Sequence, residues 1–324
     1  NQLFHSYTQS INNAQKELLQ MYAEPSMDPR VYKWRSLKVD SIQKRYTLLS
    51  KGTIAARFIS ASQPYIATKF EGADTYTKNV KVHFFEPIDF KDQVLQSSNF
   101  LIDKAIDYIL RMHTSATPSL QDYKTNIDTV CQQFLTTKPS FQLTSFVALN
   151  DLLIEFQQEA VALYLTKTYL LPLAIQLKDS EQISNSEDFI RIAIGVKAPN
   201  FQINNQKSLY DLDDATNYLL VFWSSDCGHC LKELPEVYSY LASHPEKEVE
   251  VLAIGLETTP AKWQETIKLW PQFTHVLAEG KWENELPKQY AVEATPSYYL
   301  LDASKTITSK PYLLKDLMDV LDQK

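Results

Sequence analysis

The sequence predicts an all-α N-terminal domain followed by an α/β C-terminal domain, in which a central mixed β-sheet is flanked by helices. Apolar residues recur at helical spacing through the first half of the chain, whereas the last third alternates continuous apolar runs with helical segments. A length of 324 residues favours two domains over one. We place the helical domain at residues 1–180, a polar linker at 181–194 and the α/β domain at 195–324.

Composition narrows the classes of protein to which the chain can belong. Its 44% hydrophobic and 22% charged residues are typical of globular domains. A net charge of -7, with no Lys/Arg-rich stripe, argues against a nucleic-acid partner. We predict no transmembrane span, because Lys167 and Pro172 interrupt the most apolar stretch, residues 161–177, which is expected to form a buried helix bent at Pro172. The chain opens at Asn1 rather than at a methionine, so we expect a processed protein.

The N-terminal half carries the helical pattern. One apolar stripe has the spacing i, i+3, i+4, i+7 and consists of Ile102, Ala105, Ile106 and Ile109. A similar stripe runs through residues 152–164, and Cys131 is expected to be a small buried hydrophobe in another helix. Residues 80–85 are a candidate extended segment that ends before Pro87. We find no phosphate loop, metal-spaced histidine pair or internal repeat in this half of the sequence.

The C-terminal third carries the strand pattern. Residues 218–223, 249–254 and 298–301 are continuous apolar runs, as strands that are buried on both faces require. Helical segments are expected at 227–241 and around 261–269, between these runs. Strands that alternate with helices at this spacing predict an α/β domain with a mixed sheet.

The strongest chemical signal is the tetrad Cys227-Gly228-His229-Cys230, which follows the run at 218–223 after a three-residue connection. At the start of a helix, free N–H groups and the helix dipole favour a thiolate. Two intervening residues allow the sulfurs to approach closely enough to bond. We therefore predict thiol–disulfide exchange, in which the Cys227 thiolate attacks a substrate disulfide and Cys230 then attacks Cys227 to release the product.

Two structural alternatives compete with this interpretation. A stable structural disulfide would not need a strand-to-helix position or a histidine between the thiols. A zinc site needs about four ligands, and no second cysteine or histidine pair is spaced to complete one. His229 should stabilise the thiolate, whereas the carboxylate of Asp226 should disfavour it. We expect the helix dipole and His229 to prevail, which would place the pKa of Cys227 below the free value of about 8.5.

A second signal is the dipeptide Thr295-Pro296, directly before the run at 298–301. A proline at this point cannot donate to the strand ladder, and its simplest interpretation is a trans proline at the start of the strand. Next to a dithiol we favour a cis Thr295–Pro296 bond, which would turn the backbone of Thr295 towards the sulfurs to pair with an extended substrate.

Four motifs carry a resemblance to a known family. They are Gly-x-x-Ala-Pro-x-Phe at 195–201, Phe-Trp-Ser at 222–224, Cys-x-x-Cys-x-x-Glu-x-Pro at 227–235 and Thr-Pro at 295–296. Through them, residues 195–324 resemble the thioredoxin superfamily, and specifically its TlpA/ResA-like branch of exported thiol–disulfide oxidoreductases. Residues 81–90 are similar, more weakly, to the helical domain that precedes such oxidoreductases in Bacteroidota.

The resemblance implies a thioredoxin-like fold, with Cys227 as the exposed nucleophile, Cys230 as the resolving thiol and Pro296 as the substrate-side cis-proline. Glu257 falls where this branch often carries an acidic residue, so it is either the base that takes the proton of Cys230 or an ordinary solvated carboxylate at a strand end. The implied partners are protein thiol or disulfide substrates and a redox partner protein, with no organic cofactor and no metal.

The resemblance also implies a periplasmic or otherwise exported protein, whose membrane anchor, where there is one, would lie in a segment outside this chain. The helical domain is expected to position a substrate or to mediate self-association. Two residues depart from the branch: Asp226 stands where a tryptophan is usual, and Gly228-His229 is the pair typical of disulfide isomerases. The second departure leaves both directions of electron flow open.

Two other functions compete with disulfide exchange. One is a peroxiredoxin-like peroxidase, because residues 198–201 also resemble the opening of such domains, although the attacking cysteine there does not usually belong to a C-x-x-C. The other is a copper(I) carrier or chaperone module that uses Cys227, His229 and Cys230 as ligands.

Overall fold

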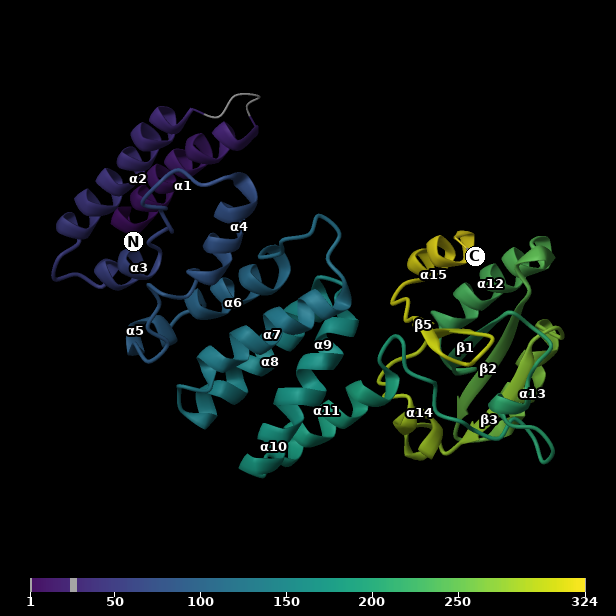
Figure 1. The fold of residues 1–324 in the computed structure, drawn as a ribbon. Coiled ribbons are helices and arrows are strands. Elements are labelled where there is room, and N and C mark those ends of the chain that lie inside the picture. The colour runs from purple at the N-terminus through teal and green to yellow at the C-terminus, as the bar shows by residue number, and fades with distance from the viewer. Residues whose placement is uncertain (1, 24–27, 324) are drawn as a thin grey trace. The chain divides into compact units, whose positions relative to one another are not determined.

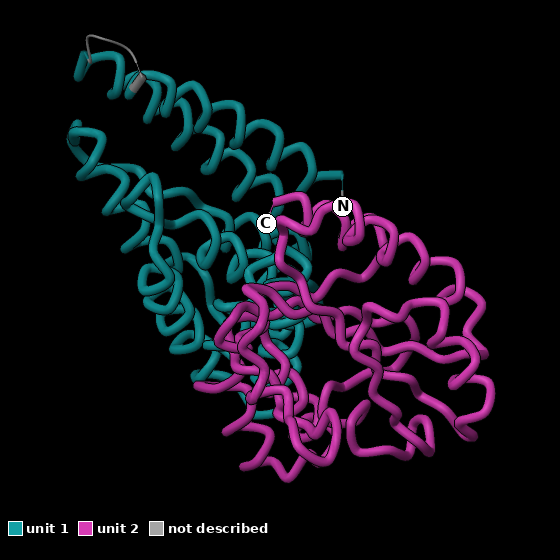
Figure 2. Tube along the Cα trace, turned by 90° about the vertical axis from the view of Figure 1, so that its right-hand side faces the viewer, with its two compact units in different colours: residues 1–165 teal, residues 166–324 magenta. Residues whose placement is uncertain are grey.

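A computed structural model describes residues 2–23 and 28–323, which divide into two compact units between residues 165 and 166 (Figure 2). The first unit is helical (Figure 1). Its α-helices are α1 (Gln2–Gln20), α2 (Pro29–Leu49), α3 (Ala55–Ala61), α4 (Ala73–Val82), α5 (Gln93–Gln96), α6 (Phe100–Arg111), α7 (Leu120–Phe134), α8 (Pro139–Glu155) and α9 (Glu159–Leu165).

Helix α4 corrects the extended segment predicted at residues 80–85. The helix continues to Val82, and turns rather than a strand cover 83–87. Tyr76 and Val80 are four residues apart and both pack into the core of the first unit. Burial of that helical face therefore outweighs the strand preference of the valines in this segment.

The second unit opens with helices as well. A π-helical turn (η2, Thr166–Leu170) leads into α10 (Leu171–Leu177), and Pro172 stands in the first turn of α10. Within the described residues, the helical run Glu159–Leu177 is long and apolar enough to cross a membrane by length and composition, and 39% of its most apolar window is buried. Core helices of soluble proteins meet the same criterion, so the run is weak support for a span.

Helix α11 (Ser180–Ile192) occupies most of the segment 181–194, which the polar sequence predicted to be a linker. It begins at Asp179, whose side chain accepts from the N–H of Gln182 at 3.0 Å and so caps the helix. At its other end Ile192 and Ile194 pack against the core of the C-terminal domain. The cap and these apolar contacts stabilise a helix in a segment whose composition is mostly polar.

The C-terminal domain is built on a five-stranded mixed sheet in the order β3-β2-β1-β4-β5. Strands β2 and β3 run parallel to β1, and β4 is antiparallel to β1 and to β5. The strands are β1 (Asn217–Trp223), β2 (Val249–Glu257), β3 (Thr274–Glu279), β4 (Ser297–Asp302) and β5 (Ile307–Ser309), and the helices between and after them are α12 (Cys230–Ser243), α13 (Pro260–Thr266), α14 (Glu285–Gln289) and α15 (Leu314–Asp322). This is the mixed sheet flanked by helices that the sequence predicted.

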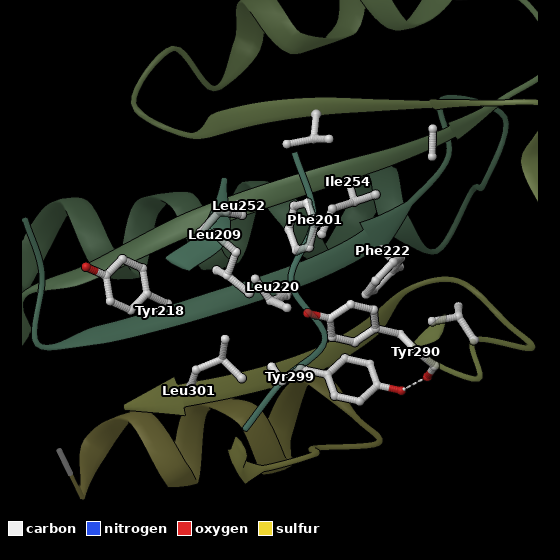
Figure 3. Close-up of a cluster of buried hydrophobic side chains, with 14 of the residues drawn as sticks. Phe201, Leu209, Tyr218, Leu220, Phe222, Leu252, Ile254, Tyr290, Tyr299 and Leu301 are labelled. Atoms are coloured by element: carbon white, nitrogen blue, oxygen red, sulfur yellow. Dashed lines mark hydrogen bonds between the residues drawn. The ribbon is translucent and has the colours of Figure 1, made fainter. Parts of the chain in front are cut away.

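Strand β1 explains the layers, because its alternate side chains enter two different cores. Leu220 and Phe222 face one core, which is drawn in Figure 3 and includes Tyr290 and Tyr299. Val221 and neighbouring odd-numbered residues face the other core, which the helices α12 and α15 cover. Both faces of β1 are therefore buried, which is why its sequence is a continuous apolar run rather than an alternating one.

Candidate functional site

Cys227 and Cys230 lie at the connection between β1 and α12. The strand ends at Trp223, the chain turns through residues 224–229, and the helix begins at Cys230. The two cysteines form a disulfide, with their Cα atoms 5.3 Å apart. Cys227 is partly exposed, whereas Cys230 is fully buried against the core on the α12 side of the sheet. A partner molecule can therefore reach the first sulfur of the pair but not the second.

Backbone groups surround the sulfur of Cys227. The N–H of Cys230 donates to Cys227 Sγ at 3.2 Å, and the N–H of Leu231 donates to the Cys227 carbonyl at 3.1 Å. Cys227 thus lies just before the N-terminus of α12, whose cap is His229, and near the partial positive charge that collects there. Once the disulfide is reduced, this arrangement stabilises a thiolate at Cys227.

The opposite side of the Cys227 sulfur faces the chain just before β4. The carbonyl oxygen of Thr295 lies 3.3 Å from Cys227 Sγ, and the Thr295–Pro296 peptide bond is cis. Because β4 is antiparallel to β1, its first residues lie at the same edge of the sheet as the last residues of β1. The sequence-distant tetrad and Thr-Pro dipeptide therefore meet at one place.

Glu257 is buried at the end of β2, with an exposed fraction of 2%. Its Oε1 accepts from the Ser225 N–H at 2.5 Å, and its Oε2 accepts from the Ser225 hydroxyl at 3.0 Å. The carboxylate therefore holds the loop two residues before Cys227. Burial also contradicts the alternative of an ordinary solvated glutamate at a strand end.

Asp226, next to Cys227, is paired with two lysines. Lys262 Nζ lies 2.7 Å from Asp226 Oδ1, and Lys281 Nζ lies 3.4 Å from Asp226 Oδ2. The hydrogen bond from Lys262, followed by the charge of Lys262 and the hydrogen bond from Lys281, holds the pKa of Asp226 below its ordinary value. The carboxylate beside the thiol is thus ionised and neutralised by its neighbours.

A pocket of 340 Å³ opens on the other flank of the dithiol. His229, Pro296 and Tyr312 are among the residues that line it, and Tyr312 is 87% exposed. Inside the pocket lining, the Tyr298 hydroxyl donates to Glu233 Oε2 at 2.7 Å. Burial and, after it, this hydrogen bond raise the pKa of Tyr298. The pocket offers aromatic and apolar surface directly beside the cis peptide bond.

The structure places all the predicted site residues around this edge of the sheet. Cys227, Gly228, His229 and Cys230 form the turn into α12, Thr295 and Pro296 lie against or beside it, and Glu257 reaches it through Ser225. Sequence reasoning missed Ser225, Lys262, Lys281 and Tyr298. The two lysines are 36 and 55 residues from Asp226, and no local pattern signals such pairs.

The described part of the chain contains no candidate metal site. Among residues 2–23 and 28–323, no group of three or more His, Cys, Asp or Glu side chains is arranged to hold a metal ion. The remaining cysteine, Cys131, is buried in α7, where burial raises the pKa of its thiol. It belongs to the core of the first unit, as the sequence predicted.

The C-terminal domain is similar to known redox proteins. Residues 194–310 match the model of the AhpC/TSA family. The chain is 28% identical over 116 residues to "Thiol-disulfide oxidoreductase ResA" of Bacillus thuringiensis subsp. konkukian. This match covers 35% of this chain and 65% of the relative. It is 30% identical over 87 residues to "Sporulation thiol-disulfide oxidoreductase A" of Bacillus subtilis, covering 26% of this chain and 52% of the relative.

A solved structure resembles most of the chain. It is a thioredoxin-like protein from Bacteroides caccae, with a TM-score of 0.53 and 18% sequence identity. The match covers 80% of this chain and 97% of that protein. At this level of identity the likeness concerns the fold, and the covered share includes helical sequence before the C-terminal domain.

Proposed function

We propose that this chain, whose C-terminal domain belongs to the TlpA/ResA-like thiol–disulfide oxidoreductases, exchanges disulfides with protein substrates through Cys227 and Cys230. The observation that carries this function is the unequal pair of sulfurs. Cys227 is partly exposed and accepts a helix N–H, whereas its bonding partner Cys230 is fully buried. An accessible attacking sulfur and a sheltered resolving sulfur are what a two-step exchange requires.

The exchange is balanced in either direction. When the chain oxidises a substrate, a substrate thiolate attacks Cys227 Sγ, the Cys227–Cys230 bond breaks, and its electron pair leaves on the sulfur of Cys230. A second substrate thiolate then attacks the substrate sulfur of the mixed disulfide, and Cys227 leaves as a thiolate. Reduction of a substrate runs through the same steps in reverse, with Cys230 attacking the mixed disulfide at Cys227.

Substrate binding uses the surface around the cis peptide bond. An extended polypeptide that enters beside Thr295 and Pro296 brings its sulfur next to Cys227, because the Thr295 carbonyl already lies 3.3 Å from that atom. The adjoining pocket at His229 and Tyr312 accepts a neighbouring side chain of the substrate. His229 is exposed beside the dithiol, where a protonated imidazole favours the thiolate.

Glu257 is the proposed base for the resolving thiol. Cys230 must lose its proton before it attacks the mixed disulfide, and it is fully buried away from solvent. Glu257 is a buried carboxylate at the same end of the sheet, and each of its oxygens retains capacity to accept beyond its bond to Ser225. Because disulfide chemistry is typical of oxidising compartments, we also propose an exported location, with a second redox protein that resets the dithiol.

Trapping of mixed disulfides tests the roles of the two sulfurs. In the Cys230→Ser variant the mixed disulfide at Cys227 has no resolving thiol, so substrate proteins should accumulate as covalent adducts. The measurement is non-reducing electrophoresis of a cell-envelope extract, followed by mass spectrometry of the adducts and of the cysteine that carries them. Cys131→Ala, which alters the buried cysteine of the first unit, is the matched control.

Equal trapping by Cys227→Ser would overturn the assignment of attacker and resolver. The competing peroxidase function gives a different outcome, in which hydrogen peroxide is consumed at an undiminished rate after Cys230→Ser. Reduction of insulin disulfides by the unaltered chain, and its loss in both single variants, completes the expected pattern.

A further inference from the structure

The carboxylate of Asp226 is the feature of the site that disulfide exchange does not explain. It is adjacent in sequence to Cys227 and carries a negative charge beside a sulfur that must itself become negative. A neighbouring like charge raises the energy of a thiolate. By itself, Asp226 therefore opposes the chemistry proposed for its neighbour.

Two lysines reverse this effect. Lys262 and Lys281 both lie within ion-pair distance of Asp226, so the three side chains together carry a net charge of +1 beside Cys227. The carboxylate that was expected from the sequence to disfavour the thiolate is thus outweighed by two cations. That sign favours the thiolate.

The fold brings each lysine to this position by a separate route. Lys262 stands in the first turn of α13, which follows β2 after a short connection. The next residue, Trp263, packs closely over Gly255 of β2, where a Cβ atom would collide with the indole. A glycine at position 255 therefore allows α13 to lie against the strand and hold Lys262 near the loop.

Lys281 is placed by the turn after β3. Gly280 has φ +94°, a left-handed conformation that glycine adopts without strain, and its N–H donates to the Glu257 carbonyl at 2.8 Å. This bond ties the turn to the end of β2, whose Glu257 side chain holds Ser225. The elements that carry both lysines thus leave the sheet at the edge where the dithiol lies.

We propose that Lys262 and Lys281 are positioning residues that neutralise Asp226 and thereby stabilise the thiolate of Cys227. This inference rests on the proposed function, because it concerns the same reactive sulfur. Other ionisable groups around the dithiol include His229 within the tetrad, Glu257 behind Ser225, Glu233 with its hydrogen-bond donor Tyr298, and Lys310 in the pocket lining. None of these is altered in the variants below.

The test measures the acidity of Cys227 in the full-length reduced chain. The rate of alkylation by iodoacetamide is followed against pH, and mass spectrometry identifies the modified cysteine. Cys131 remains protonated because burial raises its pKa, and Cys230 is fully buried, so neither competes with Cys227. No protein substrate is needed, so the result is independent of whether the proposed disulfide exchange is correct.

Loss of the lysines should make Cys227 less acidic. Lys262→Met and Lys281→Met should each raise the pKa of Cys227, and the double variant should raise it by about 0.3–0.7, the size expected for exposed ion pairs. Lys262→Arg keeps the positive charge and should leave the pKa of Cys227 at its original value. The matched control is Lys268→Met, which removes a lysine paired with Glu265 rather than with Asp226 and should leave the pKa unchanged.

A rescue by Asp226→Asn separates this role from a merely structural one. In the Lys262→Met/Lys281→Met background the carboxylate is unopposed, so Asp226→Asn should lower the pKa of Cys227 again, although not fully to its original value, because the native cluster carries a net charge of +1 and the triple variant carries none. The differences should also shrink at high salt, since exposed charges are screened. An unchanged pKa in the double variant, or a failed rescue accompanied by lowered thermal stability, would overturn the proposal.

Discussion

The two cysteines of the site differ in their surroundings more than in their position along the chain. Only two residues lie between them, yet Cys227 is partly exposed and faces the Thr295 carbonyl, whereas Cys230 is fully buried in an apolar core. The N–H of Cys230 donates to the sulfur of Cys227, so the residue proposed to resolve the mixed disulfide also stabilises the sulfur proposed to attack. The C-x-x-C spacing was readable from the sequence, but the proposed division of roles depends on the burial of one end of α12.

Glu257 gives a prediction at the same scale. Glu257→Gln keeps an acceptor for the Ser225 N–H but removes the base proposed for Cys230. With Cys230 present, the mixed disulfide at Cys227 should then persist, and its resolution should slow by about 100-fold. The measurement is a quenched time course of adduct decay with a cysteine-containing peptide.

Ser225→Ala is the matched control for Glu257. It removes one hydrogen bond to the same carboxylate and leaves the carboxylate in place. If Ser225→Ala slows resolution as much as Glu257→Gln does, Glu257 acts by holding the loop rather than by accepting a proton.

At the scale of elements, burial decided which sequence patterns were informative. The run at 218–223 predicted β1 correctly because both faces of that strand are buried, which leaves a continuous apolar signature. The polar segment at 181–194 concealed α11, whose order comes from a cap at Asp179 and from the packing of Ile192 and Ile194. Such tertiary contacts override local composition and leave little trace in it.

The packing of α13 on β2 gives a prediction about stability. Gly255→Ala would place a methyl group against the indole of Trp263, and the shift of that ring should lower the free energy of unfolding by about 1–3 kcal/mol. Urea titration followed by circular dichroism measures this change. Gly228→Ala is the control, because a Cβ atom there meets nothing within 4 Å. Equal stability of the two variants would mean that Trp263 does not need the space above Gly255.

For the whole molecule, the sequence predicted the classes of structure in both parts of the chain and the motif at the centre of the site. It predicted the dithiol and the Thr-Pro dipeptide as separate signals. It did not predict that Lys262 and Lys281 converge on Asp226, because these contacts depend on how α13 and the turn after β3 leave the sheet. Long-range charge pairing is a property of the assembled fold, which no window of sequence contains.

The division into two compact units predicts two thermal transitions with separate responses to pH. His113 lies in the first unit and His275 in the second, and burial lowers the pKa of both below 6.5. In each unit the unfolded chain therefore binds a proton at a higher pH than the folded chain does. The free energy of unfolding should decrease as the pH falls from about 7 to about 5.

Each histidine should control one transition. Calorimetry with and without reductant identifies the transition of the second unit. Reduction should shift that transition, because the Cys227–Cys230 disulfide lies in the second unit. His275→Gln keeps a donor for the Trp270 carbonyl, which lies 2.9 Å from His275 Nε2, but it no longer titrates. It should flatten the pH dependence of that transition alone, and His113→Gln should flatten the other alone. The two units would be shown not to unfold independently by either of two results. One is a single cooperative thermal transition. The other is that each histidine variant changes the pH dependence of both transitions.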